Sequence, residues 1–503
     1  MLHAMSQPVP VATYNNPPKL QSVVTIAPVP TMSLDQLQNE VQHAFEDHLT
    51  VDSLLFTSRL LQAEFREHLI SSDQRMLPSF NYTLPTGEER GTYLAVEVGG
   101  SNLRMALVDL HGRDHGQAAL QIRRTACSPI TGEVKLLPGH SFFDWMAREI
   151  QNMMVLEGET RENADPLRMG VACQTSIRSG NVLGMGKGFL CSDTVKNHDL
   201  GHMISEACQR EHVNVELEAI VNDTSSALLA RAYVDPATRL AIVLGTGMNA
   251  AIHLPISGLD PSKFDLRQVK PKRKYTHVLT NTELSMFGKN ILPTTKWDDD
   301  LNVNHMMPDY QPLEYLIAGG YLGEIVRLVM VEAADTSGFY GGKLPDSLLV
   351  THSLDTKTLA SVQSDTSVGL MTTRNLLQEK YASRTRPSAA DAKFLRNVVQ
   401  SVSRRSVAYF ATSVHALTSL LQDLDAESGL QSPLDHISIG CDGSVINKYP
   451  AYMETAQETL DQMRVQESTN RKQVFLEKTT DSAVVGAGVA GALAGNSPPS
   501  SPC

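Results

Sequence analysis

Residues 94–110 read LAVEVGGSNLRMALVDL, and residues 240–254 read LAIVLGTGMNAAIHL. Each stretch consists of an apolar run, a glycine turn and a second apolar run, which is the pattern of two strands joined by a tight turn. The glycines at 99–100 form the first turn, and the GTG at 245–247 forms the second. Because the same unit recurs far apart in the chain, the sequence predicts two similar lobes with a nucleotide between them.

Further elements surround these two units. HISIGCDGSV at 436–445 reads as a strand, a third glycine turn and the start of a helix. Apolar runs at 169–173 and 219–221 predict two more strands. Helices are expected from apolar spacing and capping residues. They are placed at 34–45 after a Ser33 cap, and at 51–69, 199–211, 313–333 and 390–424.

Size and charge narrow the class of protein. The chain has 503 residues and a net charge of −12, which suits two or three domains and disfavours nucleic-acid binding without a local basic patch. No apolar run is long enough to predict a transmembrane segment. The six cysteines lack metal-ligand spacing, so each is interpreted as a small buried hydrophobe in a reducing compartment. They are Cys127, Cys173, Cys191, Cys208, Cys441 and Cys503.

The chain divides into four predicted segments. Residues 1–32 are proline-rich and carry no secretory signal, so they are interpreted as a disordered arm. Residues 33–230 are assigned to a small N-terminal lobe, 231–494 to a large C-terminal lobe, and 495–503 to a disordered tail. A cytoplasmic location is expected. The basic run KPKRK at 270–274 is either a solvated loop, or a nuclear-import signal or contact for an acidic partner. Attachment to an organelle surface stays open.

The glycine turns and several polar residues are candidate site residues. Glycine lets exposed backbone N–H groups approach a phosphate, although no turn matches a Walker or full dinucleotide fingerprint. Asp223 lies at the end of an apolar strand and the start of a helix. It is either the helix cap or a general base at the carboxyl edge of a sheet. Asn281, Glu283 and Glu314 flank apolar runs and, taken singly, would be solvated.

Taken in order, the motifs resemble the eukaryotic hexokinase and glucokinase family over nearly all of residues 33–494. The matching runs are MLPSFNYTLPTGEERG, LAVEVGGSNLR, QTSIRSGNVLGMGKGF, IVNDT, VLGTGMN, NTELSMFG, ILPTT, QPLEYLIAGGYLGEIVRL and IGCDGS. The resemblance implies an α/β, two-lobed, actin-like ATPase fold with a ligand cleft between the lobes. It is strongest for the atypical, catalytically degenerate hexokinases of filamentous fungi.

The resemblance also implies roles for individual residues. Asp223 would accept the proton of the sugar 6-hydroxyl, and Lys187 would place positive charge near the transferring phosphoryl group. Glu97 would contact Mg²⁺ through water, and the ion would enter with ATP. Hexose contacts would come from Gln174, Gly186, Lys187, Asn222, Asp223, Asn281, Glu283 and Glu314. ATP contacts would come from Gly99, Gly100, Ser101, Asn102, Arg104, Gly245, Thr246, Gly247, Asn249, Gly443 and Ser444.

The chain departs from the family pattern inside this expected site. The sugar loop before Gln174 is shortened and lacks the usual serine, and Gly186 replaces a threonine. Glu97 stands where the family has aspartate. Ser226 adds bulk where a glycine leaves room, and Glu-Trp-Gly reads Glu-Leu-Ser at 283–285. Two lost sugar hydrogen bonds predict at least about tenfold weaker hexose binding, with nucleotide binding better preserved.

These observations leave two functional interpretations. The first is a hexokinase-family protein that binds glucose and ATP, with 6-phosphorylation weak or lost and a sugar-signalling role through a regulatory protein partner. The alternative is an active hexokinase or glucokinase that produces glucose 6-phosphate for glycolysis. A pure scaffold without ligands fits the retained phosphate turns poorly.

Overall fold

The computed structural model describes most of the chain. The described residues are 31–79, 81–155, 165–173, 176–178, 181–184, 198–263, 275–381, 386–467 and 471–495. Several predictions lie outside them. These are the arm and tail apart from residues 31–32 and 495, the basic run 270–274, the site residues Gln174, Gly186 and Lys187, and Cys191 and Cys503.

One lobe is built on a five-stranded sheet with the order β4-β3-β2-β5-β8. The first three strands form an antiparallel meander, and β5 and β8 continue from β2 in parallel. The bounds are β2 (Gly91–Val98), β3 (Asn102–Leu110), β4 (Leu120–Pro129), β5 (Leu167–Cys173) and β8 (Val215–Val221). The short hairpin of β6 (Ser176–Arg178) and β7 (Asn181–Gly184) follows β5.

The other lobe repeats this arrangement in a six-stranded sheet with the order β1-β11-β10-β9-β12-β13. Strands β9, β10 and β11 form the meander, and β12 and β13 continue from β9 in parallel. The bounds are β1 (Leu77–Pro78), β9 (Thr238–Leu244), β10 (Met248–Pro255), β11 (His277–Asn281), β12 (His436–Asp442) and β13 (Gln473–Lys478). The predicted pair of similar lobes is therefore confirmed.

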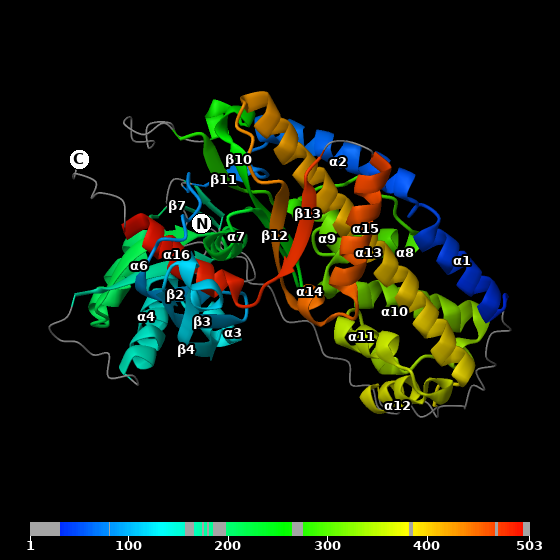
Figure 1. Ribbon diagram of the computed structural model, residues 1–503. Helices are drawn as coiled ribbons and strands as arrows, with labels where there is room; N and C mark the ends of the chain where they lie inside the picture. Colours follow the sequence, from blue (N-terminus) through cyan, green and yellow to red (C-terminus); the bar gives the residue numbers. More distant parts are fainter. Residues whose placement is uncertain are drawn as a thin grey trace, which may run out of the picture.

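Both faces of the five-stranded sheet are covered, because strand side chains alternate between the faces. Leu94 and Val96 of β2 pack with α4 (Gly139–Val155) and α6 (Leu200–Arg210). Tyr93 and Ala95 pack on the opposite face with α7 (Asp223–Val234) and α16 (Ser482–Gly495). Figure 1 shows α16, in red, lying across this small lobe.

The large lobe is organised around α13 (Ala389–Ser428). Ser388 and Asp391 form a capping box at its start, and Gly429, with φ of 66°, ends it. The helices with the most extensive contacts to it are α1 (Leu34–Glu46), α2 (Val51–Ser71), α10 (Gly319–Ser337) and α15 (Tyr452–Glu467). Further helices are α3 (Gly132–Lys135), α8 (Lys296–Asn304), α9 (Pro312–Ile317), α11 (Thr356–Ser364), α12 (Met371–Lys380) and α14 (Ser444–Lys448).

A buried ion pair fixes α13 in this lobe. Arg405 has no exposed surface and donates to both carboxylate oxygens of Asp298 in α8, at 2.5 and 2.7 Å. Its guanidinium also lies 4.6 Å from the ring centroid of Phe45 in α1. Because both charges are desolvated, loss of either partner would strand the other.

The terminal helices cross the division predicted at residue 230. Helices α1 and α2, from the start of the chain, pack on α13 of the large lobe, as Figure 1 shows in blue and orange. Helix α16, from its end, packs on α7 and on the sheet of the small lobe. Each lobe is therefore completed by the opposite end of the chain.

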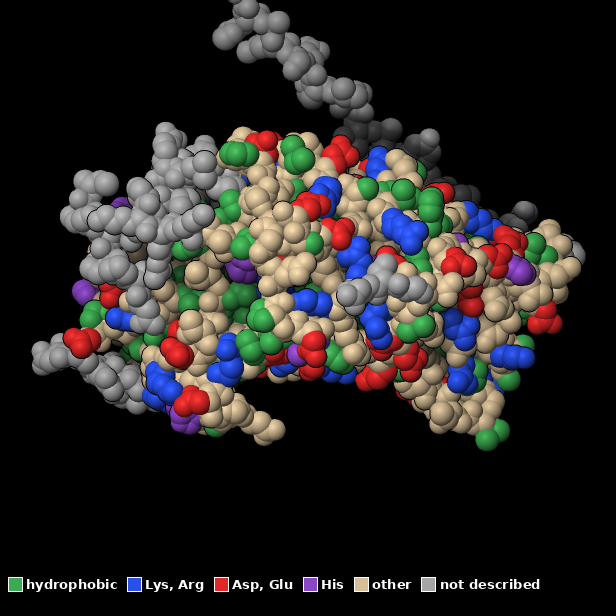
Figure 2. Space-filling view, turned by 45° about the horizontal axis from the view of Figure 1, so that its top comes forward, with side chains coloured by type: hydrophobic (Ala, Val, Ile, Leu, Met, Phe, Trp, Pro, Cys, Tyr) green, Lys and Arg blue, Asp and Glu red, His purple; other side chains and the backbone are tan. Residues whose placement is uncertain are grey.

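Two sequence predictions are wrong. The helix expected at 313–333 is two helices, α9 and α10, separated at Ala318, whose backbone is extended. Cys127 is exposed, because β4 is an edge strand whose residues alternate between partly buried and exposed; Cys173, Cys208 and Cys441 are buried as predicted. None of the described helices combines the length and apolar character needed to cross a bilayer. Acidic and basic side chains are intermingled over the face drawn in Figure 2.

Candidate active site

Asp223 is the first residue of α7, immediately beyond β8 of the small lobe. The helix cap is its neighbour, since the Asn222 side chain accepts hydrogen bonds from the Thr224 backbone N–H and hydroxyl at 3.0 and 2.6 Å. The interpretation of Asp223 as the cap is therefore wrong. Its side chain is 9% exposed, and one carboxylate oxygen accepts the Thr224 N–H at 2.8 Å.

Helix α7, which begins with Asp223, contacts elements of both lobes. It packs against α16 on one side and against β9 and β10 of the six-stranded sheet on the other. Burial raises the pKa of Glu283, which follows β11 in the large lobe; the Asn281 hydrogen bond opposes that rise and the negative charge of Asp223 adds to it.

A chain of hydrogen bonds joins three of the predicted sugar-site and nucleotide-site residues. Asn249 Nδ2 donates to Asn281 Oδ1 at 2.8 Å, and Asn281 Nδ2 donates to Glu283 Oε1 at 2.7 Å. Asn249 Oδ1 in turn accepts the Leu284 N–H at 3.2 Å. Glu283 has a φ of 53°, a left-handed conformation that costs a non-glycine residue about 1–2 kcal/mol. Such strain is concentrated at functional sites.

Glu314, at the start of α9, closes over the second glycine turn. One carboxylate oxygen accepts the Met248 N–H at 2.8 Å. A Cβ on Gly247 would lie 2.7 Å from the same oxygen, so a larger residue there would force the Glu314 carboxylate to shift. Burial, together with the negative charge of Glu314, raises the pKa of Tyr321. Tyr321 was not among the predicted site residues.

The second glycine turn also explains why α9 and α10 separate. The N–H groups of Gly319 and Gly320 donate to the carbonyls of Gly245 and Thr246, at 2.8 and 2.9 Å. A Cβ on either of these two α10 glycines would lie 2.8 Å from the carbonyl oxygen it serves. The pair Gly-Gly at 319–320 was visible in the sequence, but it was interpreted as helix interior.

The second and third glycine turns meet. Gly443 has a φ of 113°, and a Cβ there would lie 2.3 Å from the Leu244 carbonyl oxygen. A Cβ on Gly245 would lie 3.5 Å from the Ser444 backbone nitrogen. The predicted contacts for phosphate and nucleoside therefore lie side by side at the carboxyl ends of β9 and β12.

The first glycine turn is flanked by an ion-pair network. The Gly99 N–H donates to the Asn102 carbonyl at 3.0 Å, which closes the turn. Arg104 lies 3.0 Å from a carboxylate oxygen of Glu97 and also pairs with Asp481 beside α16. Burial raises the pKa of Glu97, and the Arg104 guanidinium opposes that rise. The negative charges of three further carboxylates, those of Asp223, Asp442 and Asp481, also raise the pKa of Glu97.

These carboxylates are the groups that a metal ion bound near Glu97 would encounter. Among the described residues, no group of three His, Cys, Asp or Glu side chains is placed to hold a metal directly. The carboxylates around Glu97 nevertheless provide hard oxygen donors and unfavourable mutual charge, which a divalent cation relieves. The residues therefore fit a magnesium ion that arrives with phosphates and retains its waters.

Ser226 is directed toward α16. Its hydroxyl donates to the Ala483 carbonyl at 2.5 Å, and a Cβ on Gly486 would lie 1.8 Å from the Ser226 carbonyl oxygen. The expectation that Ser226 merely adds bulk beside Asp223 missed this contact, because residues 226 and 483 are far apart in sequence. Asp442 also contacts this first turn of α16, where its carboxylate accepts the Ser482 N–H at 3.0 Å.

The two sheets and their turns have the two-lobed fold of the actin-like ATPase class. Within that class, the chain belongs to the hexokinase family. Models of that family, both described as Hexokinase, match residues 36–233 and 239–493. It is 29% identical over 427 residues to "Hexokinase-2, chloroplastic" of Nicotiana tabacum, covering 83% of this chain and 81% of the relative. It is 27% identical over 452 residues to "Hexokinase-1" of Saccharomyces cerevisiae, covering 87% of each.

Solved structures support the fold. The hexokinase of Schistosoma mansoni complexed with glucose superimposes with a TM-score of 0.76 at 23% identity, covering 92% of this chain and all of that one. A second hexokinase crystal structure superimposes with a TM-score of 0.72 at 24% identity.

Proposed function

We propose that the chain binds ATP and a hexose such as glucose, and that it transfers phosphate to the sugar 6-hydroxyl with low turnover. Family membership supports the reaction class. The observation that carries the proposal is the Asn249–Asn281–Glu283 hydrogen-bond chain, which joins predicted hexose and nucleotide contacts in the large lobe. The negative charge of Asp223, which adds to the raised pKa of Glu283, supports it.

In this mechanism the protein mainly positions the reactants, since phosphoryl transfer needs little covalent help. Asp223 accepts the proton of the attacking hydroxyl. Asn281, Glu283 and Glu314 bind the other sugar hydroxyls, and the three glycine turns hold the nucleotide. Glu97 would hold magnesium in this site, where the ion would supply neutralisation of charge on the phosphates.

Low turnover is favoured by the contacts of Arg104. This residue, expected beside the phosphates, is paired with Glu97 and Asp481, so it must leave one of them to reach ATP. The same observation favours a second candidate function. The chain would bind its ligands and report an open or closed state to a regulatory protein partner, with no useful turnover.

A coupled ATP/ADP assay with glucose, fructose and mannose, combined with calorimetric titration of each ligand, tests both candidates. The first predicts turnover roughly a hundredfold below an active hexokinase measured alongside, because misplaced groups cost about that much. The second predicts binding without turnover. Nucleotide should bind closer to ordinary strength than hexose. Binding of neither ligand would overturn both candidates.

A further inference from the structure

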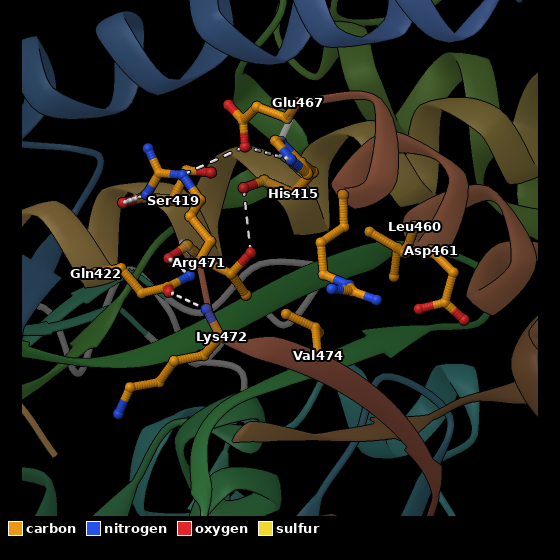
Figure 3. Close-up of a pocket in the computed structure, with 11 residues that line it drawn as sticks. His415, Ser419, Gln422, Leu460, Asp461, Glu467, Arg471, Lys472 and Val474 are labelled. Carbon is orange, nitrogen blue, oxygen red and sulfur yellow. Dashed lines mark hydrogen bonds and ion pairs between the residues drawn. The ribbon is translucent and has the colours of Figure 1, made fainter. Parts of the chain in front are cut away.

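One polar cluster of the large lobe surrounds a small pocket between α13, α15 and β13, where Figure 3 shows His415, Glu467 and Arg471 close together. Glu467 lies 3.5 Å from His415 Nε2 and 3.4 Å from Arg471 Nε. The pocket measures about 20 Å³, which is room for about one water molecule. This cluster therefore stabilises the packing of the lobe and has no room for a larger ligand.

A second polar cluster of the same lobe reaches the predicted sugar site. It consists of His305 at the end of α8, Tyr315 of α9 and Tyr321 of α10. The ring centroids lie 4.5 Å apart for His305 and Tyr315, 4.9 Å for the two tyrosines, and 5.7 Å for His305 and Tyr321. Helix side chains lean toward the N-terminus of their helix. Tyr321, in the first turn of α10, therefore leans toward α9, which carries Glu314.

The hydrogen bonds of this second cluster lead toward Glu314. The Met307 N–H donates to His305 Nδ1 at 3.1 Å. In the neutral imidazole the proton then lies on Nε2, which is 3.5 Å from the Tyr321 hydroxyl oxygen. The Tyr315 hydroxyl donates to the Met307 carbonyl at 2.7 Å and lies 3.0 Å from Nδ1. The Tyr321 hydroxyl is hydrogen-bonded to the Glu314 carboxylate. Because an ionised carboxylate can only accept, the tyrosine is the donor.

Two donors hold the Glu314 carboxylate in place. Burial raises the pKa of Tyr321, and the charge of Glu314 and the hydrogen bond to it add to the rise, so the phenol keeps its proton. Glu314 is 8% exposed, and its Oε2 accepts the Met248 N–H at 2.8 Å. A carboxylate has about four acceptor positions. The two donors therefore orient the group and leave acceptor positions for a ligand hydroxyl.

We propose that Tyr321 is a positioning residue of the hexose site: its hydroxyl holds the Glu314 carboxylate in the orientation that accepts a sugar hydroxyl. The inference rests on the proposed function, in which Glu314 binds the sugar. Tyr321 acts through Glu314 and not through a contact of its own with the hexose. His305 and Tyr315 support the role by packing against the Tyr321 ring.

The test is Tyr321→Phe in the full chain, because phenylalanine keeps the ring and removes only the hydroxyl. Calorimetric titration should show glucose binding about tenfold more weakly than to the parent, the effect of losing a hydrogen bond to a charged group. The affinity for a non-hydrolysable ATP analogue should be that of the parent. In the coupled assay, the KM for glucose should rise while the KM for ATP stays the same.

A series of monodeoxyglucoses identifies the hydroxyl through which Tyr321 acts. The analogue that lacks the hydroxyl bound by Glu314 should bind the parent and Tyr321→Phe equally, since the oriented carboxylate has nothing to accept from it. The other analogues should keep the difference seen with glucose. Such coupling between a protein group and one ligand group is what a double-mutant cycle measures, and a purely structural role would not produce it.

Tyr93→Phe is the matched control. It removes the hydroxyl of a buried tyrosine near the start of β2, where the phenol donates to the Arg90 carbonyl at 3.2 Å. It should keep the parent's glucose affinity. An equal loss in both variants, unchanged or tighter glucose binding by Tyr321→Phe, or the same loss with every deoxy analogue would overturn this inference alone. A parent that binds no hexose would overturn the proposed function, and this inference with it.

Discussion

At the scale of single residues, Asp223 shows how the end of a strand can position a general base. Val221 ends β8, Asn222 caps α7, and the capping frees Asp223 from that duty. The backbone N–H of Thr224 holds the carboxylate of Asp223 at the sheet edge. Its negative charge adds to the raised pKa of Glu283 in the large lobe. A general base needs this combination of fixed position and limited solvent access.

Asp223→Ala should lower the phosphorylation rate by about a hundredfold to ten-thousandfold, the range for a positioned base. The measurement is steady-state turnover in the coupled assay, with circular dichroism as the check on folding. Ser388→Ala is the matched control, because it removes the cap of α13, outside the predicted site, and should cost about 1 kcal/mol of stability without removing the base. A folded Asp223→Ala variant with the parent's turnover would assign Asp223 a purely structural role.

Ser226 carries a prediction opposite to the one its bulk suggested. Because its hydroxyl bonds the Ala483 carbonyl, Ser226→Gly should not speed catalysis. It should destabilise the fold by about 0.5–1.5 kcal/mol for the lost bond and about 1 kcal/mol for glycine within a helix. The midpoint of urea unfolding measures this. Ser225→Ala is the control, since the Ser225 hydroxyl has no partner among the described residues and its removal should cost less.

At the scale of elements, α16 is a helix of small and apolar residues, which allow close packing against its neighbours. Its sequence SAVVGAGVAGALAG has no polar face, because it lies between α7 and the five-stranded sheet. A Cβ on Gly170 in β5 would lie 1.8 Å from the Ala487 carbonyl oxygen, so glycines on both sides permit the close approach. Because the apolar residues of this stretch show no helical periodicity, the sequence alone did not predict this helix.

The glycines of α16 differ in how much space they have. Gly486→Ala should destabilise the protein by about 1–3 kcal/mol or more, since the new methyl group would meet the Ser226 backbone. Gly491→Ala should be neutral or stabilise by up to about 1 kcal/mol, because its nearest contact is 3.4 Å away and alanine favours helix. Thermal unfolding compares the two variants. Equal losses would contradict the predicted packing.

Asp365 joins the end of α11 to the start of α12 and makes stability depend on pH. Burial works to raise the pKa of this carboxyl, but hydrogen bonds from Ser367 and Thr373 outweigh it and lower the pKa to about 2. A lowered pKa means that the stabilisation is complete above the unfolded value near 4 and is lost as pH falls toward 2. Asp365→Asn should therefore lower Tm at pH 7, and the difference from the parent should shrink below pH 4. A difference that does not vary with pH would be contrary to this account.

At the scale of the molecule, the residues predicted to bind the ligands come from both lobes. Asp223 and Glu97 come from the small lobe, whereas Asn281, Glu283 and Glu314 come from the large one. A ligand that contacts both sets of residues makes the most contacts when the two lobes approach each other.

Small-angle scattering should therefore show a smaller radius of gyration with glucose and a non-hydrolysable ATP analogue than with neither. Each ligand alone should give a smaller change. An unchanged radius under conditions where calorimetry shows both ligands bound would mean that the lobes do not close on them.

Local signals predicted much of this fold. Ser33 and the glycine turns were visible as caps and strand connections because their effects extend over only a few residues. The contacts of Gly319 with Gly245, and of Ser226 with Ala483, join residues distant in sequence, so no local pattern encodes them. The Asn249–Asn281–Glu283 chain likewise forms only when β10 pairs with β11.

The exchange of terminal helices between lobes has a consequence during synthesis. As the chain leaves the ribosome, the strands of the small lobe emerge long before α16, which comes last among the described helices and strands. Until then the sheet face bearing Tyr93 and Ala95 is covered only in part, by α7, because α16 packs on the same face. Newborn chains would thus expose apolar surface for most of translation, a state in which aggregation competes with folding. Chaperones that bind nascent polypeptides should associate with this protein until its last helix is released.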